Sequence, residues 1–301
     1  FNNKAENGGT LAITGVEKLH IVSSVFMINE AYRMGGSICI RNIQLVSQLN
    51  NSYFMNYAKR NGGSVNSAYV TYTKYIGCKF IQNHAINGGG LYETHGEMIF
   101  IAGCLFKRNN ATISGGAIYS EKFSTIVTRN ASFLRNSAYY EGSTEFLEMV
   151  MELTHDKCIF IENIVEKYGV LFLHKIDKVY CTGSLFKKNQ AYTGAVIFGK
   201  IIVDLSSKDC NFFSNFAVFN GGVLHIRYGL WIYNIRCKFV KNIASKMHAG
   251  YIDTDYRGSG GVILIDEDSP TNLMNINSLF IKNEALHRGG VLFAYAADHC
   301  V

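Results

Sequence analysis

The chain has 301 residues, of which 48% are hydrophobic and 17% are charged, and its formal net charge is +6. This composition supplies enough apolar material for a sizeable core and excludes an intrinsically disordered protein. Lysine and arginine are spread along the chain, which excludes the basic cluster typical of nucleic-acid-binding proteins. No apolar run approaches the length of a transmembrane helix. We therefore expect a folded chain with no nucleic-acid partner and no transmembrane segment in this portion.

A repeat of 26 or 27 residues runs through the sequence. Its pattern is F-x-x-N-x-A, followed after a few residues by a Gly-Gly pair, as in Phe106, Asn109, Ala111, Gly115 and Gly116. A fixed period of this length indicates a solenoid in which each repeat is one structural unit. The last interval is 41 residues, which we interpret as one period with a loop insertion at 246–259. The asparagines of the eleven repeats are Asn3, Asn29, Asn56, Asn83, Asn109, Asn136, Asn163, Asn189, Asn215, Asn242 and Asn283.

Each repeat is predicted to be β rather than helical. In the repeat around Asn109, the stretches rich in β-branched and aromatic residues are, in chain order, 104–106, 117–119 and 125–128. Glycine and asparagine separate them, and none shows the 3.6-residue period of a helix. Units of this kind stack about 4.8 Å apart, and parallel crossovers are right-handed. The predicted fold is an all-β, right-handed parallel β-helix of eleven coils of 26–27 residues, with three short strands per coil, forming a single domain over 1–301.

The repeated positions have physical roles in such a fold. The aromatic residue three positions before the asparagine is expected to stack on its counterparts inside the coils. The asparagine is expected at a tight corner in the left-handed conformation, with its side-chain amide bonded to those of the neighbouring coils. The glycine pair is expected to allow positive φ at the next corner.

The signals F-x-x-N and G-G-[AVS]-[ILV], carried for example by Phe106–Asn109 and Gly115–Ile118, resemble the repeat of chlamydial polymorphic outer membrane proteins. Related repeats occur in large surface proteins of protists, including ciliates. The resemblance covers essentially the whole chain. It implies a pectin-lyase-like β-helix and an adhesive or structural role in an extracellular or cell-surface protein. Because both ends of the sequence fall inside a repeat, we expect these residues to be part of a longer chain.

Most of the eight cysteines share one column, five residues before the repeat asparagine. Other repeats place serine, alanine or asparagine there, which indicates a small-residue position inside the coil. Cysteine fits as a small hydrophobic residue, and stacked neighbours about 4.8 Å apart are poorly placed for a disulfide. We expect free buried thiols, and no zinc site because no C-x-x-C pair exists. The column holds Cys78, Cys104, Cys158, Cys210 and Cys237.

N-glycosylation sequons begin at Asn50, Asn110 and Asn130. Asn50 and Asn130 lie six residues before the repeat asparagine, in a column of mostly polar residues. Asn110 directly follows Asn109, in a column that also holds charged residues. All three are therefore expected to be exposed, and they are candidate glycan acceptors.

The sequence shows no catalytic constellation, so we expect no enzymatic activity, no cofactor and no metal. Enzymes that cleave acidic polysaccharides on this fold gather carboxylates from adjacent coils. Here Asp177 and Asp204 are joined by no third acid or base. His95, His174 and His225 fall in non-adjacent coils and are interpreted as surface or strand residues. A polysaccharide lyase or glycoside hydrolase remains the alternative.

Partner contacts are expected at the insertion and along two surface stripes. In the insertion the candidates are Asp253, Asp255, Tyr256 and Arg257. The first stripe, one position before the repeat asparagine, is mainly basic and is interpreted as a solvated face that blocks lateral aggregation. It consists of Gln82, Arg108, Arg135, Lys188, Lys241 and Lys282.

The second stripe follows the glycine corner. If Ile118 and Ile197 point into the coil, the next residues, Tyr119 and Phe198, point outward. A band of exposed rings usually marks an interaction surface. The alternative is a register shifted by one, with the rings inside. The candidate partner-binding residues of this stripe are Tyr119, Phe146, Phe172, Phe198 and Phe293.

These observations together predict a structural or adhesive β-helix module of an extracellular or cell-surface protein. Its expected partner is a protein or a glycan held at an exposed apolar face. Assembly into a larger complex or filament is a further expectation.

Overall fold

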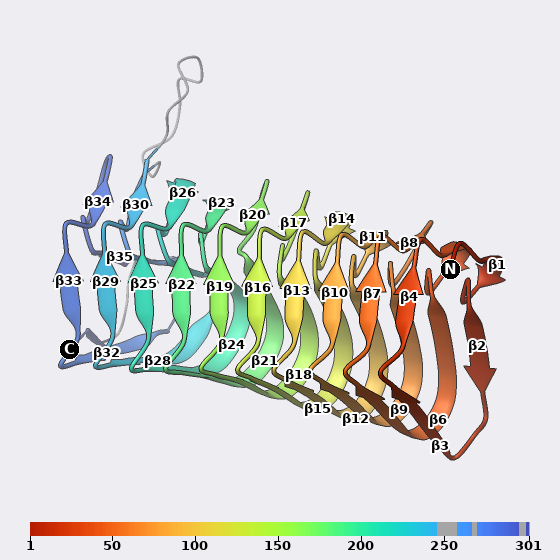
Figure 1. Ribbon diagram of the computed structural model, residues 1–301. Coiled ribbons are helices and arrows are strands. Elements are labelled where there is room, and N and C mark those ends of the chain that lie inside the picture. The colour runs from red at the N-terminus through yellow and green to blue at the C-terminus, as the bar shows by residue number, and fades with distance from the viewer. Residues whose placement is uncertain (246–257, 267–269, 295–298, 301) are drawn as a thin grey trace.

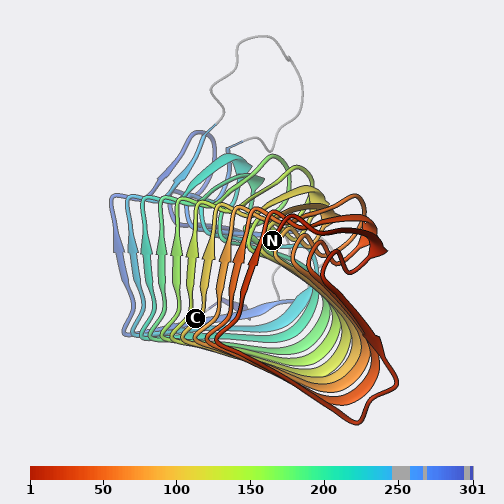
Figure 2. The same ribbon diagram turned by 45° about the vertical axis from the view of Figure 1, so that its right-hand side comes forward.

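The computed structural model describes residues 1–245, 258–266, 270–294 and 299–300. Within these ranges the regular elements are β-strands, which stack into three parallel sheets along a rod with the chain termini at opposite ends (Figure 1). This arrangement confirms the predicted parallel β-helix. In Figure 2 the coils of neighbouring repeats lie one behind another with nearly the same cross-section. The described residues contain no helix long and apolar enough to cross a membrane.

Each sheet takes one strand, or one pair of strands, from each coil. The 11-stranded sheet contains, in spatial order, β1 (Lys4–Asn7), β5 (Glu30–Met34), β8 (Tyr57–Ala58), β11 (His84–Asn87), β14 (Asn110–Ser114), β17 (Ser137–Ala138), β20 (Ile164–Val165), β23 (Gln190–Thr193), β26 (Phe216–Asn220), β30 (Ile243–Ala244) and β34 (Glu284–Ala285). The 10-stranded sheet contains β4 (Val25–Met27), β7 (Ser52–Phe54), β10 (Lys79–Ile81), β13 (Leu105–Lys107), β16 (Ser132–Leu134), β19 (Ile159–Ile161), β22 (Leu185–Lys187), β25 (Asn211–Phe213), β29 (Lys238–Val240) and β33 (Leu279–Ile281).

The 15-stranded sheet holds the longest strands. It contains β2 (Leu11–Thr14), β3 (Lys18–Val22), β6 (Ile38–Leu49), β9 (Val65–Ile76), β12 (Leu91–Ala102), β15 (Ile118–Arg129), β18 (Glu145–Asp156), β21 (Leu171–Thr182), β24 (Ile197–Lys208), β27 (Leu224–Ile226), β28 (Gly229–Ile235), β31 (Ile263–Ile265), β32 (Asn272–Ile276), β35 (Leu292–Ala294) and β36 (His299–Cys300). Residues 246–257, which make up most of the predicted insertion, lie outside the described residues.

A regular coil contains three strands, as predicted, but their bounds differ from the prediction. The stretches 117–119 and 125–128 belong to one continuous strand of 12 residues, β15. Lys122 bends this strand because it adopts the left-handed conformation with φ 63. The third strand of the coil is β14, directly after the repeat asparagine. One face of this strand is exposed to solvent, so its composition is mixed. The strand was therefore not recognised in the sequence.

The aromatic residue before each repeat asparagine stacks along the core. The ring centroids of Phe106 and Phe133 are 4.9 Å apart with planes at 5°, and those of Phe133 and Phe160 are 4.7 Å apart at 1°. All three side chains are fully buried. The spacing is close to the distance between paired strands, so in-register pairing itself produces the stack and buries a large apolar area. The predicted aromatic column is confirmed.

The repeat asparagines form a continuous hydrogen-bonded ladder. The Nδ2 atom of Asn109 donates to Oδ1 of Asn136 at 3.1 Å and to the carbonyl oxygen of Phe80 at 2.9 Å. The backbone N–H of Asn109 donates to the same Oδ1 at 3.0 Å. Equivalent side-chain bonds run from Asn3 to Asn283. The predicted ladder is therefore confirmed, with both polar groups of the amide satisfied inside the protein.

The predicted left-handed conformation of the asparagine is wrong. The preceding residue adopts it instead, as at Arg108 with φ 54 and Arg135 with φ 55. The asparagine must face inward to bond to the coils on both sides, so the corner falls one position earlier. There the side chain points into solvent, where even a long residue has room.

The glycine pair combines two requirements. Gly115 adopts φ 70, a conformation that favours glycine. A Cβ atom on Gly116 would lie 2.2 Å from the carbonyl oxygen of Ser143 and 2.3 Å from that of Ser137. The first glycine is therefore required by its backbone conformation and the second by the close approach of the next coil.

The cysteines of the interior column are buried and free, as predicted. The Sγ atom of Cys78 lies 3.3 Å from the carbonyl oxygen of Gln48 in the neighbouring coil. Burial raises the pKa of the Cys158 thiol to about 11, which keeps it protonated and unreactive at neutral pH. Cys39 and Cys181, outside the column, are also buried and free.

Candidate functional site

The aromatic stripe that the sequence predicted to be exposed is largely buried. Tyr119, Phe146, Phe172 and Phe198 are register partners on neighbouring strands, and their successive ring centroids are 4.5, 5.1 and 5.6 Å apart. Phe146, Phe172 and Phe198 are only 7%, 4% and 2% exposed, and Tyr119 is half-buried. The prediction of an exposed apolar band at these residues is therefore wrong.

The chain itself covers these rings. Ile118 and Ile197 belong to the main core, as expected, whereas the phenylalanines form a separate cluster on the other side of the 15-stranded sheet. Tyr168 packs on this cluster, with its ring centroid 4.8 Å from that of Phe198. Tyr168 directly precedes the glycine corner. The turn that leaves the 11-stranded sheet therefore covers the column of stacked phenylalanines. Phe293 is also half-buried, and the guanidinium of Arg288 lies 5.5 Å from its ring centroid.

Exposed aromatic side chains lie on the outer face of the 15-stranded sheet, as at Tyr69, Tyr72, Tyr180 and Trp231, and also along the 11-stranded sheet. In this sheet the alanine two positions after the repeat asparagine is buried, as at Ala111 and Ala138, so the residues beside it face solvent. Sequence reasoning missed this surface because it did not predict the strands of this sheet. The exposed tyrosines of these strands and of the turns that follow them are Tyr32, Tyr57, Tyr139, Tyr140 and Tyr192.

A shallow pocket of about 610 Å³ lies at the middle of this surface. Its wall includes Ile113, Tyr139, Tyr140 and Glu166. The rings of Tyr139 and Tyr140, 52% and 41% exposed, meet edge to face with centroids 5.1 Å apart. The ammonium of Lys167 lies 4.1 Å from the centroid of Tyr140, within range of a cation–π interaction. The pocket therefore combines apolar rings with polar and charged edges.

The outer face of the 15-stranded sheet carries a row of ionisable residues that the sequence analysis did not bring together. Glu121, Glu148 and His174 are register partners on β15, β18 and β21. His174 Nδ1 lies 2.9 Å from Glu148 Oε1. Burial lowers the pKa of His174, although the Glu148 carboxylate opposes this shift. Burial also raises the pKa of Glu141 in the neighbouring column, and the charge of Glu148 adds to that effect.

These residues were not brought together because the acids are one repeat apart in sequence and their strand was not predicted to be continuous. Within the described ranges, no group of three histidine, cysteine, aspartate or glutamate residues is placed to hold a metal ion.

Two further groups of paired ionisable residues lie within the described ranges, one near the C-terminal end and one in the core. His225 Nε2 contacts Asp266 Oδ1 at 2.9 Å, and Arg227 also pairs with Asp266, at 3.3 Å. In the core, His155 Nε2 contacts Glu145 Oε2 at 2.8 Å with both side chains buried. Burial lowers the pKa of His155, but Glu145 and Cys181 together more than offset this, and the net pKa is well above the ordinary value. The predicted partner contacts in the insertion lie outside the described residues, at Asp253, Asp255, Tyr256 and Arg257.

The three sequon asparagines, Asn50, Asn110 and Asn130, are exposed, as expected for glycan acceptors. The side chain of Asn110 is already bonded, since its Oδ1 accepts from the Ser137 hydroxyl at 2.8 Å and its Nδ2 lies 2.9 Å from His84 Nδ1. Attachment of glycan stays a prediction. The six residues of the basic stripe are exposed as well, and Arg135 pairs with Glu162 at 2.7 Å.

Comparison with known proteins gives one match. Residues 103–121 match the family model of the Chlamydia polymorphic membrane protein repeat. No curated protein and no solved structure matches this chain. The matched segment includes the F-x-x-N signal at Phe106 and the glycine pair at Gly115 and Gly116. The match suggests a surface or outer-membrane protein, and together with the stacked parallel sheets it describes a β-helix repeat protein similar to the polymorphic membrane proteins.

Proposed function

We propose that this chain is an adhesive β-helix module of a cell-surface or extracellular protein, and that it binds a protein partner through the exposed face of the 11-stranded sheet. The observation that carries the proposal is the set of exposed tyrosines on this face, with Tyr139 and Tyr140 at its pocket. A repeat similar to that of polymorphic membrane proteins supports the surface location.

The chemistry of these side chains favours a protein partner. Tyrosine offers a large rigid apolar ring with a polar hydroxyl and loses little conformational entropy on binding, which is why it is enriched at protein interfaces. Ile113 adds an aliphatic contact that is 43% exposed, and Glu166 adds a charge at the rim of the same pocket. An apolar centre with a polar rim is the usual composition of a binding surface.

The rod geometry supports the same proposal. In-register strands place equivalent side chains at intervals of about 4.8 Å, so one coil after another adds to a continuous surface. A solenoid uses such extended faces for recognition because each coil is held rigidly by its neighbours. The stacked Phe and Asn columns make the support under Tyr139 and Tyr140 stiff.

The proposal is tested by binding of the purified chain to an array of extracellular and cell-surface proteins. The double variant Tyr139→Ser/Tyr140→Ser removes the two central rings, and Tyr180→Ser, on the outer face of the 15-stranded sheet, removes an exposed tyrosine elsewhere. We expect the double variant to lose about tenfold or more in affinity for any protein that the chain binds, because central aromatic residues dominate interface energies. Tyr180→Ser should bind normally. Equal binding by all three chains contradicts the proposal, as does an array without any bound protein.

Glu121, Glu148 and Glu141 favour one alternative, a polysaccharide hydrolase or lyase. Retaining glycosidases use two carboxyl groups about 5–5.5 Å apart, and neighbouring strands bring paired residues to a similar spacing. Glu121 and Glu148, which pair in register, would be the two carboxylates, and the charge of Glu148 acts on Glu141, whose pKa is raised mainly by burial. Release of new reducing ends or unsaturated products from acidic polysaccharides, abolished by Glu148→Gln, would establish this alternative. No release from a broad polysaccharide panel contradicts it.

A further inference from the structure

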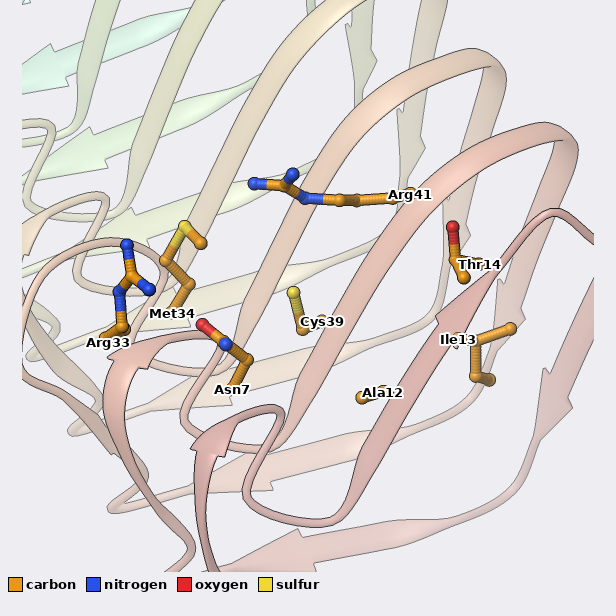
Figure 3. Close-up of a pocket in the computed structure, with 8 residues that line it drawn as sticks. All are labelled: Asn7, Ala12, Ile13, Thr14, Arg33, Met34, Cys39 and Arg41. Atoms are coloured by element: carbon orange, nitrogen blue, oxygen red, sulfur yellow. The ribbon is translucent and has the colours of Figure 1, made fainter.

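A second concave site lies between the first two coils of the chain. It is a pocket of about 370 Å³ between β1 and β5 on one side and β2 and β6 on the other (Figure 3). Nothing in the proposed function uses it. It is lined by Asn7, Ala12, Ile13, Thr14, Arg33, Met34, Cys39 and Arg41.

The pocket is open because its floor lacks aromatic residues. Ala12 pairs in register with Cys39, and Cys39 pairs with Asn66. This is the same column that holds Tyr92 and Tyr119 in later coils, where the rings stack at 4.7 Å and fill the space. The small side chains at the start of the column therefore leave a hollow where the following coils have a closed aromatic stack.

Two arginines line this hollow. Figure 3 shows the side chain of Arg41 extending above Cys39, whereas Arg33 stands on the other side of Met34. Arg33 is bound to Glu6 through an exposed contact of 3.1 Å, a kind of pair that contributes little and is easily exchanged. Arg41 forms no salt bridge with the described residues. The pocket thus holds positive charge that an anion can neutralise.

The remaining wall favours a ligand that carries hydroxyl groups as well as charge. Thr14 presents a hydroxyl, and Asn7 has a buried Oδ1 atom without a hydrogen-bond partner. A ligand hydroxyl can satisfy such an amide after a small rotation. Met34 supplies apolar surface for the face of a ring. A guanidinium recognises carboxylate and sulfate groups in a two-point geometry.

We propose that this pocket binds an acidic sugar residue, with Arg33 and Arg41 holding its carboxylate or sulfate group and Thr14 and Asn7 contacting its hydroxyls. The site is distinct from the tyrosine surface of the 11-stranded sheet, and each can exist without the other. The shared chemistry is an oxyanion on a hydroxylated ring, which both uronic acids and sulfated sugars supply.

Isothermal titration calorimetry of the purified chain tests this proposal. The probes are trigalacturonate, a sulfated heparin trisaccharide, neutral maltotriose and inorganic sulfate. We expect one or both acidic sugars to bind, and maltotriose and sulfate to bind at least tenfold more weakly. Sulfate binding as tightly as the sugars would mean that the pocket takes a bare oxyanion, which overturns the sugar assignment. Absence of binding by both acidic sugars also overturns it.

Variants locate the site. Arg41→Gln should weaken binding of the acidic sugar about tenfold or more, because a charge-assisted two-point contact is lost. Cys39→Tyr should abolish binding by filling the hollow with the residue type that later coils carry in this column. Arg129→Gln, an exposed arginine on β15 outside the pocket, is the matched control and should bind normally.

The proposals of protein binding at the tyrosine surface and of sugar binding at the pocket can be tested independently. Tyr139→Ser/Tyr140→Ser should keep full affinity for the acidic sugar, so loss of protein binding in that variant does not bear on the pocket. If Cys39→Tyr fails to fold, Arg41→Gln still decides the matter. Unchanged affinity in Arg41→Gln contradicts the proposal.

Discussion

Asn109 and Asn136, 27 residues apart in sequence, are joined by a side-chain hydrogen bond of 3.1 Å in the fully buried interior of the rod. The Oδ1 atom of Asn136 also accepts from the backbone N–H of Asn109. One amide thus serves two donors of the preceding coil while its own Nδ2 continues the chain of bonds. Register between coils is fixed by this arrangement, because a shift of one residue would break every bond of the ladder.

Removal of one amide from the ladder should destabilise the rod. Asn109→Leu leaves the carbonyl of Phe80 and the donors of Asn83 without their partner. Each unsatisfied buried group costs about 1–3 kcal/mol. The control Asn211→Leu makes the same chemical change at a half-exposed position. The residues that occupy this column in the two preceding coils are Leu185 and Ile159, so aliphatic side chains are already present there. Thermal unfolding followed by circular dichroism should show a clear loss of melting temperature for Asn109→Leu alone. Equal melting temperatures would show that the ladder does not contribute.

The cysteines should be reduced and shielded. The seven cysteines whose side chains the structure describes are buried and free, and Cys78 and Cys104 lie on neighbouring coils without a disulfide. Thiol titration of the native chain should therefore find almost no reactive group. Titration in denaturant without reductant should find most of the eight cysteines of the sequence. A largely oxidised population under denaturing conditions would contradict the packing described here.

Stability should fall as pH rises through the range in which Glu93 ionises. Glu93 is fully buried, its Oε1 accepts from the Tyr75 hydroxyl at 2.5 Å, and burial raises its pKa from 4.5 to about 7. The folded state therefore keeps a proton that the unfolded chain releases above about pH 4.5. The folded state loses on the order of 3 kcal/mol of stability between about pH 4.5 and about pH 7, since each pKa unit corresponds to about 1.36 kcal/mol.

Denaturant unfolding at about pH 5 and about pH 8 measures this effect. Glu93→Gln keeps the shape of the side chain and removes its titration, so the difference in unfolding free energy between the two pH values should shrink in this variant. Glu97→Gln, on the same strand at an exposed position, is the control and should behave like the unchanged chain. The same pH dependence in Glu93→Gln would contradict the assignment.

Much of the fold follows from the repeat alone. The F-x-x-N spacing correctly places Phe106 inside and Asn109 in the ladder, because a column that recurs in every coil meets the same environment each time. The bounds of the strands could not be predicted from the repeat. Lys122 bends β15 without interrupting it, and nothing in a lysine signals a left-handed residue within a strand.

The surface was harder to predict than the core. The alternation of side chains along the strand correctly predicted that Phe198 points away from the main core. It gives no information on Tyr168, which covers the Phe198 ring from the preceding coil. The exposure of a side chain on a solenoid depends on the path of the turns, and these vary in length between repeats. The row from Glu121 to His174 was missed for a related reason, since residues one repeat apart become neighbours only when the register is known.

The tyrosines proposed to bind a partner are exposed on the 11-stranded sheet, whereas the stacked phenylalanines at the glycine corner are buried. Hydroxyl-radical footprinting with mass spectrometry measures this residue by residue. Tyr139, Tyr140 and Tyr192 should be oxidised rapidly, whereas Phe172 and Phe198 should be protected. Rapid oxidation of Phe172 and Phe198, with protection of the tyrosines in the isolated chain, would contradict the account.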